Sequence, residues 1–515
     1  MALGMKKLMA AVAAVAMAST LAACSGNEAA PTPTAAEKLT VGYPTDITGR
    51  NVDPALTVGG SAAPFLYSVY DTLFKFDQDG VPQPNLASKS ELSADGKTMT
   101  LTIKEGVKFQ DGSPLTAKDV VFSIDRSRGA DATLKGPTQA SSLAAVAAVS
   151  SPDDKTVVIS MKQPNPILPN VLAYFPGMVV PAAYIAKVGN DGFLKAPIGS
   201  GPYKLTSATQ GQSLELAAFA DYTGSPKPAY KDVTLKVLTD GSARLAALRS
   251  GGIDFAVDVD VTQSASLESS GFTVKGNRAG ARLSVLLNGK TPGLSDPKVS
   301  RAFNMAVNIE AIRDSLFSGK ATLASTIDPT VSVDKIEPYK QNVEEAKKLL
   351  DEAKFDRSRT LILDYPAGNF PQGELIVQAV QSDLAAVGVK VDLRPMDTNT
   401  WSEKLQSKSL DDLSLFRSRN TTYDSFQSIN DAFTCSGPYS MWCDPKLDEQ
   451  LVGLSTKGGA ERVSGFLDFN KAVHENPPSI FLVDPDQICA MKKGIEWQAT
   501  PGTTNFTFAQ IQPVS

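Results

Sequence analysis

Residues 84–126 read PNLASKSELSADGKTMTLTIKEGVKFQDGSPLTAKDVVFSIDR, and their patterning predicts a compact α+β unit. Apolar and polar residues alternate strictly over residues 98–104, as they do in a strand with one buried face. A turn is expected before this strand, at residues 94–96. A second short strand is expected over residues 106–109, followed by a turn at residues 111–112.

A capped helix is expected to close this unit. Thr116 and Asp119 have the spacing of a capping box, in which each side chain accepts a hydrogen bond from the other residue's backbone. The helix is expected over residues 117–126, with Val120, Val121 and Ile124 on its inner face. Strand, turn, strand, turn and capped helix thus follow one another within one short segment.

Other short motifs accompany this unit in order along the chain. They are NVDPA at 51–55, VYDTL at 69–73, GSGPY at 199–203, SARLAAL at 242–248, VSRAF at 299–303, NVEEAKKLL at 342–350 and DPKLD at 444–448. With residues 84–126 they span nearly all of residues 39–515. In this order they resemble the peptide/nickel-type substrate-binding proteins of ABC importers, which are solute-binding family 5.

The resemblance implies an α/β fold with two lobes facing a cleft. This is the type II, cluster C-like periplasmic-binding-protein fold, in which an extra α+β domain is added to the first lobe. Because the chain leaves and re-enters the first lobe, the lobes are discontinuous. The expected boundaries are 39–68, 193–270 and 481–515 for the first lobe, 69–192 for the extra domain, and 271–480 for the second lobe.

The resemblance also implies a function. Such a protein captures a small solute by lobe closure and delivers it to an ABC permease in the membrane, and we expect it to act as a monomer without a cofactor. A peptide-like or anionic solute is expected. A ligand-sensing receptor component and an oligosaccharide-binding member of the same family remain alternatives, and a secreted hydrolase is disfavoured.

Composition argues against an enzyme or a nucleic-acid-binding protein. The only histidine is His474, which excludes a metal site built on several histidines, and we expect it on the surface of a polar helix over residues 467–475. No G-x-S-x-G, H-E-x-x-H, P-loop or G-x-G-x-x-G motif occurs. The net charge of −5 without basic runs disfavours nucleic acid.

The N-terminus predicts an export signal over residues 1–23. Lys6 and Lys7 precede an apolar stretch at residues 8–18, which is too short to span a bilayer. The sequence LAAC at residues 21–24 is the bacterial lipoprotein pattern, so Cys24 is expected to become the lipid-carrying first residue. An ordinary secretory signal followed by a chance cysteine is the alternative.

A tether and a disulfide are expected outside the cytoplasm. Residues 24–38 are small, polar and proline-containing, and cannot pack a core. Cys435 and Cys443 flank a Gly-Pro turn and are expected to form a small-loop disulfide, because a metal site there lacks further ligands. Cys489 is expected to be a buried free thiol.

The ligand site is expected near residues 413–426. In dipeptide binders of the family, a strand ending in an aromatic residue leads to an Asp that pairs with the peptide amine. An ungapped comparison puts Phe416 at the aromatic position and Arg419 at that Asp, with Arg417 nearby. Arginine favours a carboxylate or phosphate, which predicts an anionic ligand group. The alternatives are that Asp424 is the true acid, or that Arg419 pairs with a protein carboxylate.

Other residues complete the expected ligand site. Asn420 and Tyr423 belong to the same loop as Arg419. Trp401 lies in a helix expected over residues 398–406, where a core or surface position is equally compatible with the sequence. The loop after the first strand contributes three further candidates, which are Thr57, Gly59 and Ser61.

Overall fold

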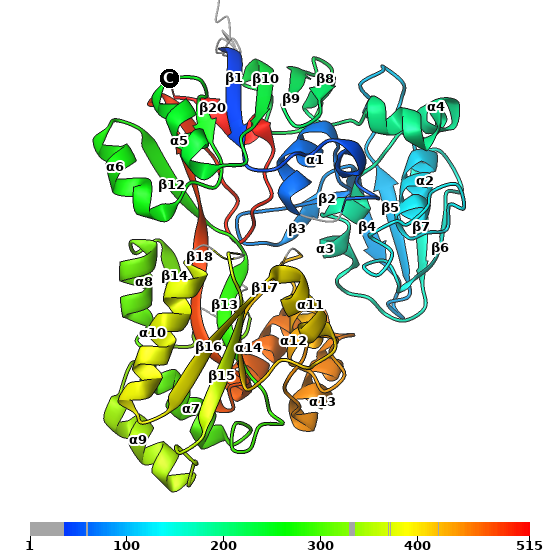
Figure 1. Cartoon of the computed structure of the whole chain (residues 1–515). Helices are drawn as coiled ribbons and strands as arrows, with labels where there is room; N and C mark the ends of the chain where they lie inside the picture. The colour runs from blue at the N-terminus through cyan, green and yellow to red at the C-terminus, as the bar shows by residue number, and fades with distance from the viewer. Residues whose placement is uncertain are drawn as a thin grey trace, which may run out of the picture. The chain divides into compact units, whose positions relative to one another are not determined.

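A twelve-stranded mixed sheet is the central element of the fold (Figure 1). The structure is a computed structural model that describes residues 36–57, 60–328, 335–368, 370, 372–420 and 422–514. Residues 35–515 make one compact unit. The strand order is β16-β15-β17-β13-β18-β11-β1-β10-β9-β8, and β12 and β14 also pair with β18.

The long strand β18 (Ser479–Met491) divides this sheet into two lobes. Its later residues pair with the first-lobe strands β11 and β12, and its earlier residues pair with the second-lobe strands β13 and β14. The first-lobe strands are β1 (Ala36–Tyr43), β8 (Tyr203–Thr209), β9 (Ser213–Ala218), β10 (Tyr230–Val237), β11 (Phe255–Ala256) and β12 (Thr273–Arg278). The second-lobe strands are β13 (Ala281–Leu287), β14 (Ala321–Leu323), β15 (Thr360–Pro366), β16 (Lys390–Met396) and β17 (Leu413–Arg419).

Helices cover the apolar faces of both lobes (Figure 1). In the first lobe they are η1 (Gly49–Val52), η2 (Gly60–Ala62), α1 (Ala63–Val69), α5 (Gly241–Arg249), η4 (Val261–Gln263), α6 (Ser264–Ser269) and η6 (Phe508–Gln510), with a small ribbon of β19 (Ile495–Trp497) and β20 (Ile511–Pro513). In the second lobe they are α7 (Pro297–Ala306), α8 (Ile309–Phe317), α9 (Val343–Glu352), α10 (Gly373–Ala386), α11 (Thr398–Gln406), α12 (Phe426–Phe433), α13 (Pro445–Leu454) and α14 (Gly459–Glu475).

The extra domain is built on a separate antiparallel sheet of order β4-β5-β7-β6. Its strands are β2 (Phe74–Phe76), β3 (Pro82–Pro84), β4 (Ala87–Leu92), β5 (Thr98–Ile103), β6 (Val146–Ser150) and β7 (Thr156–Met161). Its helices are α2 (Ala117–Ser127), α3 (Leu168–Val171), η3 (Phe175–Gly177) and α4 (Ala182–Lys195).

The alternation over residues 98–104 forms a strand, as predicted. Met99, Leu101 and Ile103 of β5 are buried, because successive side chains of a strand point to opposite faces. The capping box is also confirmed: the Asp119 carboxylate accepts the Thr116 backbone N–H at 2.9 Å. Val120 and Ile124 of α2 pack into the same core as β5.

The second strand expected over residues 106–109 does not form. Lys108 makes only an isolated bridge with Pro114. The Phe109 backbone N–H donates to the carbonyl of Ser113, and the Leu115 N–H donates to that of Val107. The chain therefore closes on itself around the turn at residues 111–112, which leaves no room for a longer ladder.

A buried ion pair joins the extra domain to the first lobe. Arg126, near the end of α2, donates to both carboxylate oxygens of Asp53 at 2.7 Å, and both side chains are almost fully buried. Asp53 also accepts the backbone N–H of Ala55, and its carbonyl accepts that of Thr57. The pair thus holds the loop that follows η1.

A second buried ion pair lies where the chain crosses between the lobes. Arg282 of β13 donates to both carboxylate oxygens of Asp484 of β18, at 2.7 and 2.6 Å.

None of the helices described is long and apolar enough to cross a membrane. The residue boundaries expected for the lobes stay a prediction.

Candidate functional site

Three adjoining cavities lie among the lobes and the extra domain. The central cavity, of about 660 Å³, has a volume typical of small-molecule sites. The side cavity of about 450 Å³ shares Gly60, Ala279, Arg419 and Thr504 with it. A third cavity, of about 420 Å³, shares Thr503 and Asn505 with the central cavity, and we call it the Asp71 cavity because Asp71 is one of its lining residues. The central cavity is lined by Thr57, Gly60, Thr138, Gln139, Tyr174, Phe175, Ala279, Gly280, Arg419, Asn420, Thr503, Thr504 and Asn505.

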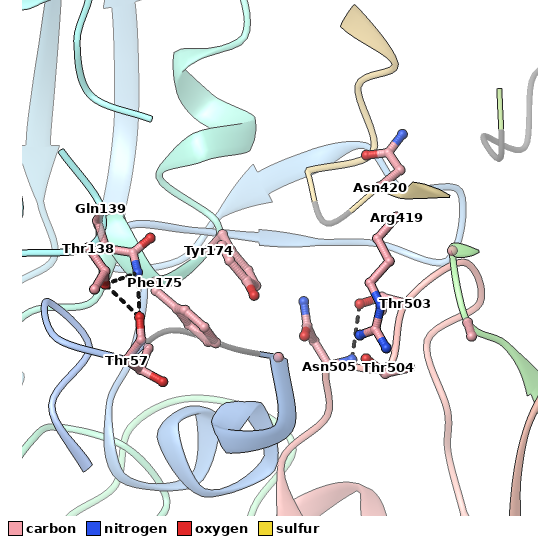
Figure 2. A pocket seen from close by; sticks show the side chains of 13 residues that line it. Thr57, Thr138, Gln139, Tyr174, Phe175, Arg419, Asn420, Thr503, Thr504 and Asn505 are labelled. Atoms are coloured by element: carbon pink, nitrogen blue, oxygen red, sulfur yellow. Dashed lines mark hydrogen bonds between the residues drawn. The ribbon is translucent and has the colours of Figure 1, made fainter. Parts of the chain in front are cut away.

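The extra domain fixes one wall of the central cavity. The carbonyl of Thr57 accepts hydrogen bonds from the Thr138 hydroxyl and from the Gln139 amide, the latter at 3.1 Å (Figure 2). Because the Asp53–Arg126 pair holds the same loop from its other end, the wall is anchored at both ends.

Arg419 brings a positive charge to the junction of two cavities. It ends β17, where it pairs with Ala281 of β13, and it lines both the central and the side cavity. A Cβ at Gly60 would lie 3.9 Å from Arg419 Nη1, and 4.0 Å from both the Thr504 and the Tyr174 hydroxyl. A guanidinium and two hydroxyl groups therefore surround one point of the cavity wall. No described carboxylate forms an ion pair with Arg419, whose side chain is exposed.

Three buried polar atoms of this cavity have no hydrogen-bond partner within the described part of the chain. They are Thr57 Oγ1, Asn420 Nδ2 and Asn505 Nδ2. Buried polar groups in proteins are almost always satisfied, so their gathering in one cavity marks a place for a polar solute. Figure 2 shows the Asn505 amide and the Tyr174 hydroxyl directed toward the space beside Arg419.

Strand alternation places Arg417 beside Arg419 and turns Phe416 away. Arg417 lines the side cavity, and its guanidinium lies 4.8 Å from the centre of the Phe370 ring, a cation–π contact. Burial, with the nearby charge of Arg419, lowers the pKa of Arg417 to about 10. Phe416 instead joins the core of the second lobe.

Trp401 also lies in that core and reaches none of the three cavities. It is in α11, which spans the residues expected, and its Nε1 donates to the Ser414 hydroxyl at 3.0 Å. Its indole ring lies 6.4 Å from the Phe416 ring and 6.5 Å from the Phe370 ring. Trp401 therefore supports β17 from behind.

Asp424 is neutralised by a protein cation. Arg462 of α14 donates to both of its carboxylate oxygens, at 2.6 and 2.7 Å, and both side chains are buried. Tyr423 packs on Phe76 at 4.5 Å between ring centres, and its hydroxyl donates to the carbonyl of Pro501. Neither residue lines the cavities, so the loop places Arg419 and Asn420 at the site and uses the next residues for packing.

The loop after the first strand is divided between two cavities. Thr57 lines the central cavity and Ser61 lines the side cavity. The carbonyl of Ser61 accepts the Tyr43 hydroxyl. Gly59 lies outside the described residues.

Several lining residues carry no signal in the sequence. Thr138 and Gln139, Tyr174, and residues 503–505 come from three separate segments. Nothing local distinguishes them from other polar loop residues, and only the chain's tertiary course brings them together.

The cysteines are arranged as predicted, whereas the histidine is not. Cys435 and Cys443 form a disulfide, and Cys489 is a buried free thiol. His474 is half-buried rather than on the surface, because its ring stacks on Tyr339 at 4.2 Å and its Nδ1 lies 2.8 Å from the carbonyl of Ser325. Over the part of the chain that is described, no group of three potential metal ligands occurs.

Comparison with known proteins agrees with this architecture. The sequence profile of the bacterial extracellular solute-binding proteins, family 5, middle region, matches residues 81–440. The glutathione-binding protein GsiB of Pectobacterium atrosepticum is 28% identical over 459 residues, which are 86% of this chain and 88% of GsiB.

Solved structures confirm the expected fold. The substrate-binding protein CtaP of an ABC transporter of Listeria monocytogenes superposes with a TM-score of 0.82 at 23% identity, covering 94% of this chain and 100% of CtaP. AgaA of A. tumefaciens R10, solved with agropinic acid, superposes with a TM-score of 0.72 at 25% identity, covering 92% of this chain and 98% of AgaA. The two-lobed α/β fold with an extra β-sheet domain is common to these proteins.

Proposed function

Because the chain belongs to family 5 of the bacterial extracellular solute-binding proteins, we propose that it binds a small peptide-like solute with an anionic group and passes it to an ABC importer. It acts as a solute-binding protein rather than as an enzyme. The solute occupies the central cavity and its anionic group meets Arg419.

The position of Arg419 carries this proposal. A guanidinium holds a carboxylate or phosphate through two parallel hydrogen bonds, and Arg419 has no carboxylate partner in the described structure. The Tyr174 and Thr504 hydroxyls lie around the same point and can donate to the same anion. GsiB is named as a glutathione-binding protein and AgaA was solved with agropinic acid, and both of these compounds bear carboxylates.

Lobe closure is the proposed means of capture. Thr57 and residues 503–505 come from the first lobe, Gln139 and Tyr174 from the extra domain, and Arg419 from the second lobe. A solute that contacts all three parts gains its full set of contacts only when they are together, so it shifts the population toward the closed form. The lobes would move about the crossing at β13 and β18.

Attachment to the membrane completes the proposal. Cys24, outside the described residues, stands at the lipoprotein pattern and is proposed to carry lipid. The tether over residues 24–38 would then let the folded unit reach the permease. Membrane fractionation of a Cys24→Ser variant tests this attachment.

The anionic group is tested with Arg419→Gln and, as control, Arg313→Gln. Arg313 is a partly exposed arginine paired with Asp314 on α8, outside the cavities. We expect Arg419→Gln to weaken binding of glutathione, or of the solute released from the denatured protein, by about tenfold or more, because charge-assisted bonds contribute about 1.5–3 kcal/mol. Isothermal titration calorimetry measures the affinity. Equal affinity of Arg419→Gln and wild-type protein would remove Arg419 from the site.

A further inference from the structure

The Asp71 cavity has mixed polar and aromatic walls, and the exposed side chain of Lys75 also lies at its lining. It continues from the central cavity past Thr503 and Asn505. Its aromatic lining comes from α1, the extra domain, the loop after β9 and the C-terminal segment, and consists of Tyr67, Tyr70, Phe76, Tyr222 and Phe506. The negative faces of such rings attract cations.

A carboxylate without a cationic partner lies in this wall. Asp71 is half-buried; its Oδ1 accepts the Tyr222 hydroxyl at 3.4 Å and its Oδ2 accepts the Ser200 hydroxyl at 3.3 Å. No described lysine or arginine is within ion-pair distance of it. Burial raises the pKa of Asp71 to about 6, which reflects an incompletely compensated charge.

The other acidic residue of this cavity, Asp77, already accepts hydrogen bonds from its own turn. The Asp77 carboxylate accepts the backbone N–H groups of Asp79 and Val81 and the side-chain amide of Gln83, at 2.8–2.9 Å. It therefore shapes its own turn. Asp71 accepts long hydrogen bonds from Ser200 and Tyr222, with Asn85 as a further donor, and each carboxylate oxygen keeps acceptor capacity.

We propose that the Asp71 cavity binds a cationic group of the solute, an ammonium or a guanidinium. The inference rests on the proposed function, because it takes Arg419 as the site of the anionic group. Arg419 and Asp71 line different cavities, joined at Thr503 and Asn505, so the solute is a zwitterion extended through that junction. A peptide with its carboxylate at Arg419 and its amine at Asp71 has this polarity.

The test compares tetra-alanine with N-acetyl-tetra-alanine, which lacks the cationic amine. We expect Asp71→Asn to weaken tetra-alanine binding at least tenfold in calorimetry and to leave N-acetyl-tetra-alanine binding unchanged. We expect Asp71→Glu, which keeps the charge, to restore part of the lost affinity. Asp221→Asn is the control, because it removes an exposed charge paired with Lys108 next to Tyr222 in sequence.

The outcomes separate this inference from the proposed function. If Asp71→Asn weakens both peptides equally or neither, the cationic subsite is wrong, whatever Arg419→Gln does. If Arg419→Gln changes neither affinity while Asp71→Asn acts on tetra-alanine alone, the anionic site is wrong and the cationic subsite stands. Thermal unfolding of each variant verifies that it is folded.

A smaller probe keeps the inference testable if neither peptide binds. Crystals of wild-type protein soaked in n-butylammonium should show the amine beside Asp71, and those of Asp71→Asn should not. Absence of the amine from the wild-type cavity would overturn the inference.

Discussion

At the residue scale, the position of a charge within a strand decides its role. Arg417 and Arg419 are two apart on β17 and share a face, so both meet the cavities, whereas Phe416 points into the core. Asp424, only five residues after Arg419, pairs with Arg462 instead. This short segment therefore carries one charge without a described protein partner, Arg419, and one that is neutralised, Asp424. Only their tertiary contacts distinguish the two.

Asp71 should make stability depend on pH in a defined direction. Its pKa is raised from 3.8 to about 6 by burial, so the unfolded chain loses this proton at lower pH than the folded protein does. The free energy of unfolding therefore falls as pH rises from about 4 to 6, and Asp71→Asn removes that fall.

The measurement is urea unfolding of both proteins below and above this range. We expect the stability of Asp71→Asn relative to wild-type protein to be higher above about pH 7 than below about pH 4. The same difference at both pH values would mean that Asp71 titrates as it does in the unfolded chain.

At the element scale, α2 does more than cover a sheet. Its capping box starts it, Val120 and Ile124 bury it against β5, and Arg126 near its end binds Asp53 of the first lobe. The helix therefore couples the extra domain to the loop that carries Thr57. The motif at residues 51–55 and the end of the stretch at residues 84–126 meet in this pair.

Breaking this pair should destabilise the protein strongly. Asp53→Asn leaves the buried Arg126 uncompensated, and we expect a loss of about 3–5 kcal/mol in the free energy of unfolding. Denaturant titration measures it. Asp125→Asn, whose partner Arg128 at the C-cap of α2 is partly exposed, should cost about 1 kcal/mol or less. Similar losses in both variants would contradict a structural role for the buried pair.

At the scale of the whole molecule, one loop joins all three parts. Tyr423 of the second lobe packs on Phe76 of the extra domain and bonds to Pro501 of the first lobe. The Asn170 amide donates to the carbonyl of Thr422 at 2.8 Å. These contacts adjoin the cavities, so filling the site and bringing the parts together involve the same segments.

Membrane attachment is the prediction that belongs to the whole chain. Each buried CH₂ group of a lipid contributes about 0.8 kcal/mol, so acyl chains on Cys24 should hold the protein on the membrane. We expect Cys24→Ser to appear in the soluble extracytoplasmic fraction with unchanged solute affinity. Retention of the variant on membranes would refute the lipid anchor.

The elements were predictable because their signals are local, and the family was predictable because its motifs follow one another in order along the chain. Alternation over residues 98–104, the Thr116–Asp119 spacing and the paired cysteines depend on neighbours within a few residues, and they formed as expected. The strand predicted over residues 106–109 did not form, because a tight turn overrode the strand tendency of these residues. Arg419 was predicted to meet ligand from family spacing, and the structure places it at the cavities.

Only the tertiary structure decided the rest of the site. Arg462, which neutralises Asp424, lies 38 residues away in sequence. Tyr174, Gln139 and Asn505 come from distant segments, and no spacing rule connects them. A cavity is formed by side chains that meet through packing, so its walls, and whether a charge in them finds a partner, depend on contacts that local sequence does not encode.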